Sequence, residues 1–322
     1  MSDRNVRLGA TMITFYNTGY WGLPDDVSYE DFRTLVNADP RPYFERMLDG
    51  MVAAGVEGIE LAPIPGGWQN ALKAYGDAAG FAQALTSRGL ELGSSYQNGE
   101  SLIGEVLDGS MTEAQVDTYV HAHAQFVAEM GAEVIIMGTV QRSLFTGRDL
   151  ARPVPDDAME RVAAQINRQA QIAARYGVRI ALHTDAYSVC SRNQDITRML
   201  ELTDPASVQL CLDAGHTTLD GGDAVAALAA HVDRVPVMHW KDCSQPLDGT
   251  TLLDHPDQHS VMLEYFRIFG DGVIDWRAWQ QVLADARWRG WAMAENDMAA
   301  DPVAEIRKGL EFYRNELEQI YR

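Results

Sequence analysis

Residues 208–216 read VQLCLDAGH, an apolar run that ends in an aspartate and is followed by Ala-Gly-His. A short, nearly continuous apolar run of this kind is typical of a strand that is buried on both faces of a parallel sheet. Seven other segments along the chain have the same character. Together with residues 208–212, the predicted strands are residues 8–13, 58–61, 90–94, 134–137, 178–182, 235–240 and 291–294.

Helical patterns separate these strands. The amphipathic stretches are residues 43–54, 112–130, 158–176, 224–232, 276–286 and 303–318. Gly55, Gly131 and Gly177 each stand just after such a stretch and ahead of a strand, where glycine commonly ends a helix. Eight strands that alternate with helices predict an α/β fold, a closed (β/α)₈ TIM barrel formed by a single domain over residues 1–322. The alternative is an open doubly wound sheet, but no GxGxxG motif follows the first strand.

The composition fits an acidic globular protein. The chain has 322 residues, with 26 Lys and Arg against 46 Asp and Glu, and a formal net charge of −20. This charge argues against a nucleic-acid partner and against an anionic membrane. The sequence has neither a signal-peptide core nor an apolar run of about 18 residues, so we expect no membrane span. Its three cysteines form no CxxC pair, which favours free thiols and a cytoplasmic location.

Two segments exceed ordinary loop length: residues 14–40, after the first strand, and residues 244–271, after the seventh. Long loops in a compact domain are usually functional, and barrel enzymes carry their active sites in the loops that follow strands. We expect Tyr16, Trp21 and Trp68 to form an apolar wall that binds a ring-bearing substrate. A subunit interface or a packed lid is the alternative for these aromatic residues.

Metal-binding residue types follow the last four predicted strands. They are His183, Asp213, His239 and Glu295. Neighbouring barrel strands end on one rim, so we expect these side chains to converge at the mouth of the barrel. Two imidazoles and two carboxylates form a mixed nitrogen and oxygen set that suits Mn²⁺, Fe²⁺, Co²⁺ or Zn²⁺. We expect Cys211 to point away from this ligand side.

Residues 213–216 (DAGH), 238–242 (MHWKD), 269–276 (FGDGVIDW) and 291–295 (WAMAE) carry a resemblance to a known family. The chain resembles the sugar phosphate isomerase/epimerase superfamily of xylose isomerase-like TIM barrels. Within it, the chain is most similar to the branch of the inosose dehydratases and C-glycoside deglycosidases. The resemblance implies one divalent ion, Mn²⁺ in the first place and Co²⁺, Fe²⁺, Mg²⁺ or Zn²⁺ as alternatives. It also implies that His183, Asp213, His239 and Glu295 bind this ion and that His216 contacts the substrate.

The fifth predicted strand departs from the usual pattern of the superfamily. Its ligand is usually a glutamate, which forms a proton-transferring pair with the glutamate of the eighth strand in the isomerases and epimerases. Here the residue is His183, which leaves Glu295 without that partner. A neutral ligand also makes the ion a stronger Lewis acid toward a carbonyl group. Both effects favour elimination over epimerisation.

The predicted chemistry is abstraction of a proton beside a ketone, followed by departure of a β-substituent. The catalytic candidates are His216, Lys241 and Glu295. Lys241 either stabilises an oxyanion or only pairs with Asp242. Asp185 is a candidate substrate-binding residue, acid or base, and an alternative role is to orient a ligand histidine. The residues alone do not decide among these roles.

The sequence therefore predicts a metal-dependent carbon–oxygen or carbon–carbon lyase that acts on a keto-sugar, of the inosose dehydratase or 3-oxo-glycoside deglycosidase type. The alternative is a metal-dependent isomerase or epimerase acting on a ketose. A third alternative is a sugar-binding barrel without catalysis. The expected partner is a small sugar or glycoside, and the deglycosidase reading adds a small partner subunit. We also expect a homo-oligomer.

Overall fold

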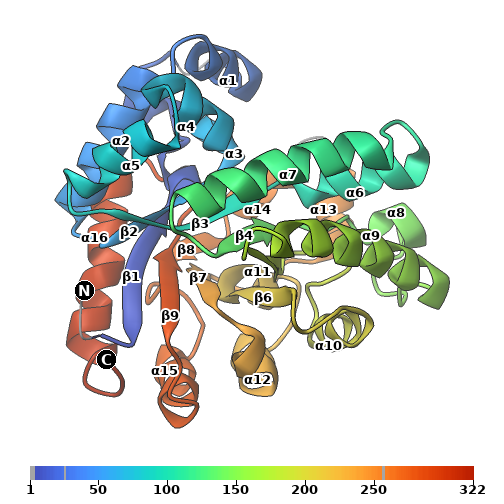
Figure 1. The fold of residues 1–322 in the computed structure, drawn as a ribbon. Coiled ribbons are helices and arrows are strands. Elements are labelled where there is room, and N and C mark those ends of the chain that lie inside the picture. The colour runs from blue at the N-terminus through green and yellow to red at the C-terminus, as the bar shows by residue number, and fades with distance from the viewer. Residues whose placement is uncertain (1–3, 25–26, 256–257) are drawn as a thin grey trace.

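The computed structural model describes residues 4–24, 27–255 and 258–322. Its described residues form a closed barrel of eight parallel strands with helices around the outside (Figure 1). The barrel closes because β9 pairs with β1 on one side and with β7 on the other. This confirms the prediction of a (β/α)₈ TIM barrel. The barrel strands are β1 (Val6–Thr11), β2 (Gly58–Leu61), β3 (Glu91–Gln97), β4 (Val134–Met137), β5 (Arg179–His183), β6 (Val208–Asp213), β7 (Val237–Cys243) and β9 (Gly290–Ala294).

The helices that cover the barrel begin and end at residues suited to caps. Thr112 and Gln115 form a capping box at the start of α7, and Gly55 ends α2 in the left-handed conformation at φ 90°. The covering helices are α2 (Arg41–Ala54), α4 (Trp68–Tyr75), α5 (Ala78–Thr86), α6 (Gly99–Asp108), α7 (Glu113–Glu129), α9 (Asp156–Ala174), α10 (Asn193–Leu202), α12 (Ala224–His231), α15 (Trp276–Asp285) and α16 (Pro302–Phe312). Short helices at the strand ends are α3 (Pro63–Gly66), α8 (Ser143–Thr146) and α11 (Ala214–Leu219). Short helical turns lie at Val232–Arg234 and Tyr313–Leu317. No described helix is long and apolar enough to cross a membrane.

The two long segments after strands are folded rather than irregular. After β1, which ends at Thr11, come the 3₁₀ turns Met12–Phe15 and Thr18–Trp21 and helix α1 (Tyr29–Ala38). After β7 come α13 (Gly249–Asp254), α14 (Gln258–Leu263) and the short strand β8 (Phe266–Ile268). Because β8 pairs antiparallel with the end of β7, it extends β7 three residues beyond the predicted bound of residue 240.

The barrel interior below the site holds a small apolar layer. It contains Cys211 together with Val134, Ile136, Ala181, Val237 and Met293. Residues two positions apart in a strand point to the same face, so Cys211 shares its direction with Asp213. The expectation that Cys211 points away from the ligand side is therefore wrong. This thiol lies directly under the polar residues of β6 and β7.

Asp242 ties the segment after β7 to the barrel. Its carboxylate accepts hydrogen bonds from the backbone amides of Cys243, Gly270, Gly272 and Ile274 and from the indole of Trp276, at 2.7–3.2 Å. The predicted alternative in which Lys241 pairs with Asp242 is therefore wrong. One buried carboxylate instead fixes both the β7–β8 hairpin and the start of α15.

Replacing Asp242 tests this tether. Asp242→Ala leaves four backbone amides and an indole without their acceptor, and we expect roughly 3–5 kcal/mol less stability. Asp242→Asn keeps one carbonyl acceptor and should lose less. The control is Asp275→Ala, which removes only the acceptor for the Ala278 amide at the start of α15 and should cost about 1 kcal/mol. Urea unfolding measures all three variants, and equal losses for Asp242→Ala and Asp275→Ala would contradict the tether.

Candidate active site

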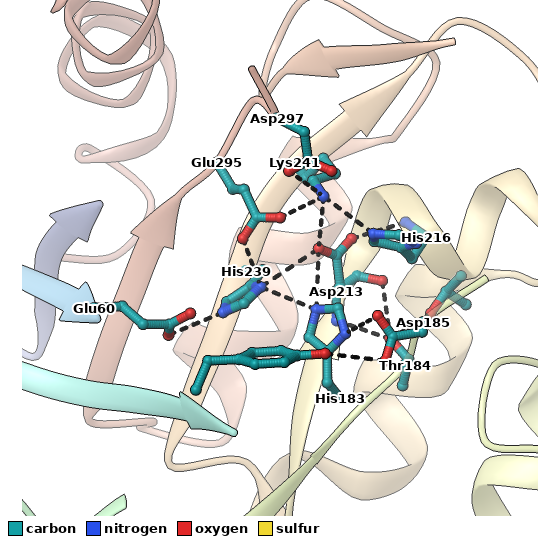
Figure 2. Close-up of polar contacts among 12 residues, drawn as sticks. Glu60, His183, Thr184, Asp185, Asp213, His216, His239, Lys241, Glu295 and Asp297 are labelled. Carbon is teal, nitrogen blue, oxygen red and sulfur yellow. Dashed lines mark hydrogen bonds and ion pairs between the residues drawn. The ribbon is translucent and has the colours of Figure 1, made fainter. Parts of the chain in front are cut away.

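A cavity of about 520 Å³ opens at the carboxyl ends of the barrel strands. His183 ends β5, Asp213 ends β6, His239 lies inside β7, and Glu295 follows β9 directly. The side chains converge from different strands, as Figure 2 shows. Their nearly complete burial means that the surrounding protein, rather than water, determines their charges.

The four predicted ligands lie within a few ångströms of one another. His183 Nε2 lies 3.0 Å from His239 Nδ1, and Glu295 Oε2 lies 2.8 Å from the same His239 nitrogen. Asp213 Oδ2 lies 3.5 Å from His183 Nε2 and 3.6 Å from His239 Nδ1. Asp213 Oδ1 accepts the backbone amide of His216, whereas buried Oδ2 has no hydrogen-bond partner among the described residues. This arrangement leaves an unsatisfied carboxylate oxygen beside two ring nitrogens.

Two further carboxylates orient the histidine rings. His239 Nε2 donates to Glu60 Oε2 at 3.0 Å, and Ser94 Oγ donates to the same oxygen at 2.7 Å. His183 Nδ1 lies 2.9 Å from Asp185 Oδ1, as a close ion pair. These carboxylates hold hydrogens on the outward nitrogens. The inward nitrogens, His183 Nε2 and His239 Nδ1, are thereby left as ligand atoms.

The donor set fits a divalent cation. Two imidazole nitrogens and two carboxylates are the ligands that divalent ions from manganese to zinc accept, and Asp213 Oδ2 lacks any other partner. Burial lowers the pKa of His183, but Asp185 and Asp213 outweigh burial and hold this pKa well above its ordinary value. Burial also lowers the pKa of His239, but its neighbours Cys211, Glu60 and Glu295 raise this pKa further than burial lowers it. In the absence of a cation, protons bound to His183 and His239 take its place.

His216 lines the cavity and lies close enough to Asp213 and Glu295 to form a ligand group with them, but its hydrogen bonding does not favour that role. The backbone amide of Ala186 donates to His216 Nδ1 at 3.0 Å, so a neutral ring carries its hydrogen on Nε2. A ring in this state has no free lone pair to offer a metal. Burial, together with the charge of Lys241, lowers the pKa of His216 to about 3.

Lys241 lies two residues beyond His239 along β7 and is not among the described residues that line the cavity. Its ammonium contacts Glu295 Oε1, lies 2.9 Å from Asp297 Oδ1, and lies 3.7 Å from Asp213 Oδ2. Burial lowers the pKa of Lys241, but the three carboxylates outweigh burial and raise it, so the ammonium stays charged. Lys241 therefore neutralises part of the negative charge of the site.

The structure places the three predicted aromatic residues outside the described lining of the cavity. Tyr16 donates its hydroxyl to the Tyr29 carbonyl and stacks on Phe32. Trp21 donates to the Phe15 carbonyl. The remaining ring, Trp68, donates to the Tyr119 hydroxyl and stacks on His123 at 5.3 Å. These rings pack the segment after β1 and the helices, so a substrate wall made of them is corrected to internal packing.

Three residues of the site were not predicted from the sequence: Glu60, Tyr96 and Asp297. All three line the cavity, and Tyr96 donates its hydroxyl to Asp185 Oδ2 at 3.3 Å. Burial raises the pKa of Asp297 to about 7, against the opposing charge of Lys241. Glu60 had a readable signal, because a charged residue inside an apolar strand needs a buried partner. Asp297 lies two residues after Glu295, which was a weaker signal.

A comparison with protein families identifies the fold family. Residues 48–316 match the model of the xylose isomerase-like TIM barrel. The chain belongs to the xylose isomerase-like TIM barrel family. Because the match covers strands β2 to β9, it includes every predicted metal ligand.

Relatives within this family bear names of sugar enzymes. The chain is 27% identical over 280 residues to the inosose dehydratase of Geobacillus thermodenitrificans, covering 84% of this chain and 89% of the relative. It is 28% identical over 301 residues to the inosose dehydratase of Klebsiella pneumoniae subsp. pneumoniae, covering 80% and 97%. The chain spans nearly the full length of both proteins.

Solved structures share the fold at low sequence identity. The "probable 3-DHS dehydratase AsbF" of Bacillus anthracis superposes with a TM-score of 0.68 at 13% identity, covering 96% of this chain and 99% of that protein. The IolI protein, whose crystal contains a zinc atom, superposes with a TM-score of 0.69 at 12% identity, covering 98% and 99%. These likenesses support the barrel fold.

Metal binding should release protons. Because the pKa values of His183 and His239 are raised in the metal-free fold, their protons stabilise that fold at low pH and are lost as the pH rises through the raised values. A cation must displace these protons, so its affinity rises with pH, about tenfold per pH unit for each proton released. Calorimetry of Mn²⁺ binding in buffers of different ionisation enthalpy counts the protons. An affinity that is flat between about pH 6 and pH 8 would contradict this assignment.

Glu60→Gln tests the orientation of His239. The amide accepts a weaker hydrogen bond than the carboxylate, so the inward nitrogen of His239 is held less firmly. We expect Mn²⁺ affinity to fall about 10- to 100-fold with little loss of stability. The control is Glu91→Gln, at the opposite end of the barrel, where the carboxylate only pairs with Arg7. Unchanged affinity in Glu60→Gln would separate Glu60 from the metal site.

Proposed function

We propose that the protein is a metal-dependent lyase that removes water from a cyclic keto-polyol of the inosose type. The observation that carries this proposal is the imidazole of His183 where isomerases and epimerases of the superfamily usually have a glutamate. Glu295 has no second glutamate among the proposed ligands, and its two oxygens are engaged by Lys241 and His239. Relatives named inosose dehydratase support the same reading.

We assign the metal ligands to His183, Asp213, His239 and Glu295, with Mn²⁺ as the favoured ion. The bound cation supplies Lewis-acid stabilisation of negative charge on the ketone oxygen of the substrate. Lys241 keeps Glu295 ionised and in place. These residues bind the ketone end of the substrate, while the proton transfers fall to the other polar groups that line the cavity.

The proton transfers use groups around the rim of the donor set. The carboxylates of Asp185 and Asp297 line the cavity, and one of them removes the proton from the carbon next to the ketone. The electron pair of that bond forms the enolate, and its return breaks the β carbon–oxygen bond. The departing hydroxyl takes the proton back from the carboxylic acid formed in this way and leaves as water, while the neutral ring of His216 lines the cavity and keeps its own hydrogen. The products are an unsaturated ketone and water.

A glycoside substrate is the second candidate. Ile13, Leu252 and Met262 give the cavity an apolar side, which suits an aglycone better than it suits water. The aromatic residues of the segment after β1, however, no longer support this reading, because they pack internally. Dehydration therefore ranks first, and the small partner subunit remains a prediction that belongs to the glycoside reading.

The deciding experiment incubates the manganese-loaded protein in D₂O with three probes: 2-keto-inositol, an aryl 3-oxo-glucoside and free ketohexoses. Mass spectrometry follows the products. We expect loss of water from 2-keto-inositol. Loss of the aryl group would support the glycoside candidate instead. An unchanged skeleton that gains one deuterium would mean an isomerase or epimerase, and would overturn the lyase assignment.

His183→Glu provides the matched comparison for this experiment. The variant restores the carboxylate usual in the superfamily while keeping the other proposed ligands. We expect slower elimination and a gain of deuterium exchange without elimination, because two glutamates then face the substrate. Wild-type products at the wild-type rate would show that the imidazole does not decide the reaction.

A further inference from the structure

The turn after β5 contains a strained residue beside the active site. Tyr187 has φ 63°, the left-handed region that bulky side chains rarely adopt. A conformation of this kind costs on the order of 1–3 kcal/mol and persists only where the surroundings hold it. Tyr187 is held at both ends, since its amide donates to Asp220 Oδ2 at 3.3 Å and its hydroxyl donates to the Leu247 carbonyl at 2.6 Å.

Asp220 belongs to a buried cluster of charges outside the described lining of the cavity. Its carboxylate accepts from Ser191 Oγ and from the guanidinium groups of Arg142 and Arg192. The side chains of Arg142 and Asp220 are each 1% exposed, and Arg142 also contacts Asp195 at 2.8 Å. Two arginines and two aspartates balance in charge, which is the condition for burying them.

The cluster connects two segments that meet at His216. On one side, the turn that contains Tyr187 also supplies the amide of Ala186, which donates to His216 Nδ1. On the other side, helix α11 carries His216 and is followed directly by Asp220, whose own amide donates to the His216 carbonyl at 3.2 Å. Asp220 therefore contacts both segments that form the Ala186–His216 hydrogen bond: its carboxylate accepts the Tyr187 amide, and its own amide donates to the His216 carbonyl.

The two nitrogens of His216 both face donors. Lys241 Nζ lies 3.1 Å from Nε2, and the Ala186 amide points at Nδ1. A neutral imidazole has only one nitrogen that accepts, so one of these donors must direct its hydrogen elsewhere. The amide hydrogen is fixed in direction, whereas Lys241 has Glu295 and Asp297 for its hydrogens. The ring therefore accepts at Nδ1 and carries its hydrogen on Nε2.

We propose that Asp220 is a positioning residue: by holding the strained Tyr187 turn against helix α11, it fixes His216 in the tautomer that accepts at Nδ1 and carries its hydrogen on Nε2. Arg142 and Arg192 hold the Asp220 carboxylate in place by donating hydrogen bonds to it. The structural part of the inference stands without the proposed function. Its effect on turnover rests on the proposed lyase reaction.

The primary test reads the tautomer directly. Long-range ¹H–¹⁵N spectra of the metal-free protein with ¹⁵N-labelled histidine distinguish a ring nitrogen that carries hydrogen from one that accepts. For the wild type we expect His216 with hydrogen on Nε2 only. In Asp220→Asn we expect a mixture of both tautomers, because the neutral amide no longer draws both arginines and the Tyr187 amide together. The control Asp223→Asn, in which only the acceptor for the Ala226 amide is weakened, should keep the wild-type spectrum.

Two further variants keep the test decisive. Arg192→Gln removes a partner that is 26% exposed, and it tests the cluster if Asp220→Asn does not fold. Tyr187→Gly keeps the amide and relieves the strain, so it should keep the wild-type tautomer. A wild-type ring with hydrogen on Nδ1 would overturn the proposal. So would a wild-type tautomer in both Asp220→Asn and Arg192→Gln.

Turnover gives the second readout. With the substrate found in the product experiment, kcat of Asp220→Asn should fall about 10- to 100-fold while KM changes little, because binding at the metal is left intact. An altered tautomer with unchanged kcat would overturn the functional half of the proposal. If no probe turns over in the wild type, the proposed function fails, and the spectra still decide the structural half.

Discussion

The site depends on two imidazole nitrogens that meet inside the barrel. His183 Nε2 and His239 Nδ1 lie 3.0 Å apart, and whenever both rings are neutral their lone pairs face each other. Asp185 and Glu60 enforce this, since they hold hydrogens on the outward nitrogens. Such an arrangement is stable only with a proton or a cation between the rings, and the neighbouring carboxylates of Asp213 and Glu295 favour a cation.

Charge balance explains why so many acidic groups are tolerated in one buried place. The donor set alone carries two carboxylates, and Asp185, Glu60 and Asp297 lie next to it. Lys241 supplies a permanent positive charge beside the donor set, close to three of these carboxylates. A second balanced cluster, around Asp220, supports the turn above β5 without adding net charge to the cavity. Lys241 therefore stabilises the proposed metal ligands, whereas the Asp220 cluster stabilises the turn after β5.

The barrel and the convergence of four polar residues were predictable from the sequence, because both follow from short-range patterns: apolar runs of strand length, each ended by a ligand type. Other features depend on contacts between distant segments. The sequence suggested that Asp242 pairs with its neighbour Lys241, but its carboxylate accepts hydrogen bonds from backbone amides about 30 residues further along the chain. The aromatic residues after β1 looked exposed, since nothing local showed that Phe32 covers them. Glu60 was readable in principle, as a charge inside an apolar strand.

At position 183 this chain has a histidine where the superfamily usually has a glutamate. The negative charge is not lost from the site but lies on the neighbouring Asp185 instead. A glutamate ligand would place its charge directly on a cation, whereas His183, our proposed ligand, would present a neutral nitrogen to it and lies 2.9 Å from the Asp185 carboxylate on its outward side. The pair keeps the overall charge of the site, and the ligand atom itself becomes neutral. Asp185 also lines the cavity and accepts the hydroxyl of Tyr96, so the displaced charge faces the substrate. In the proposed reaction, the neutral ligand His183 strengthens the electrophile and the nearby Asp185 supplies a carboxylate, which is the combination that β-elimination needs.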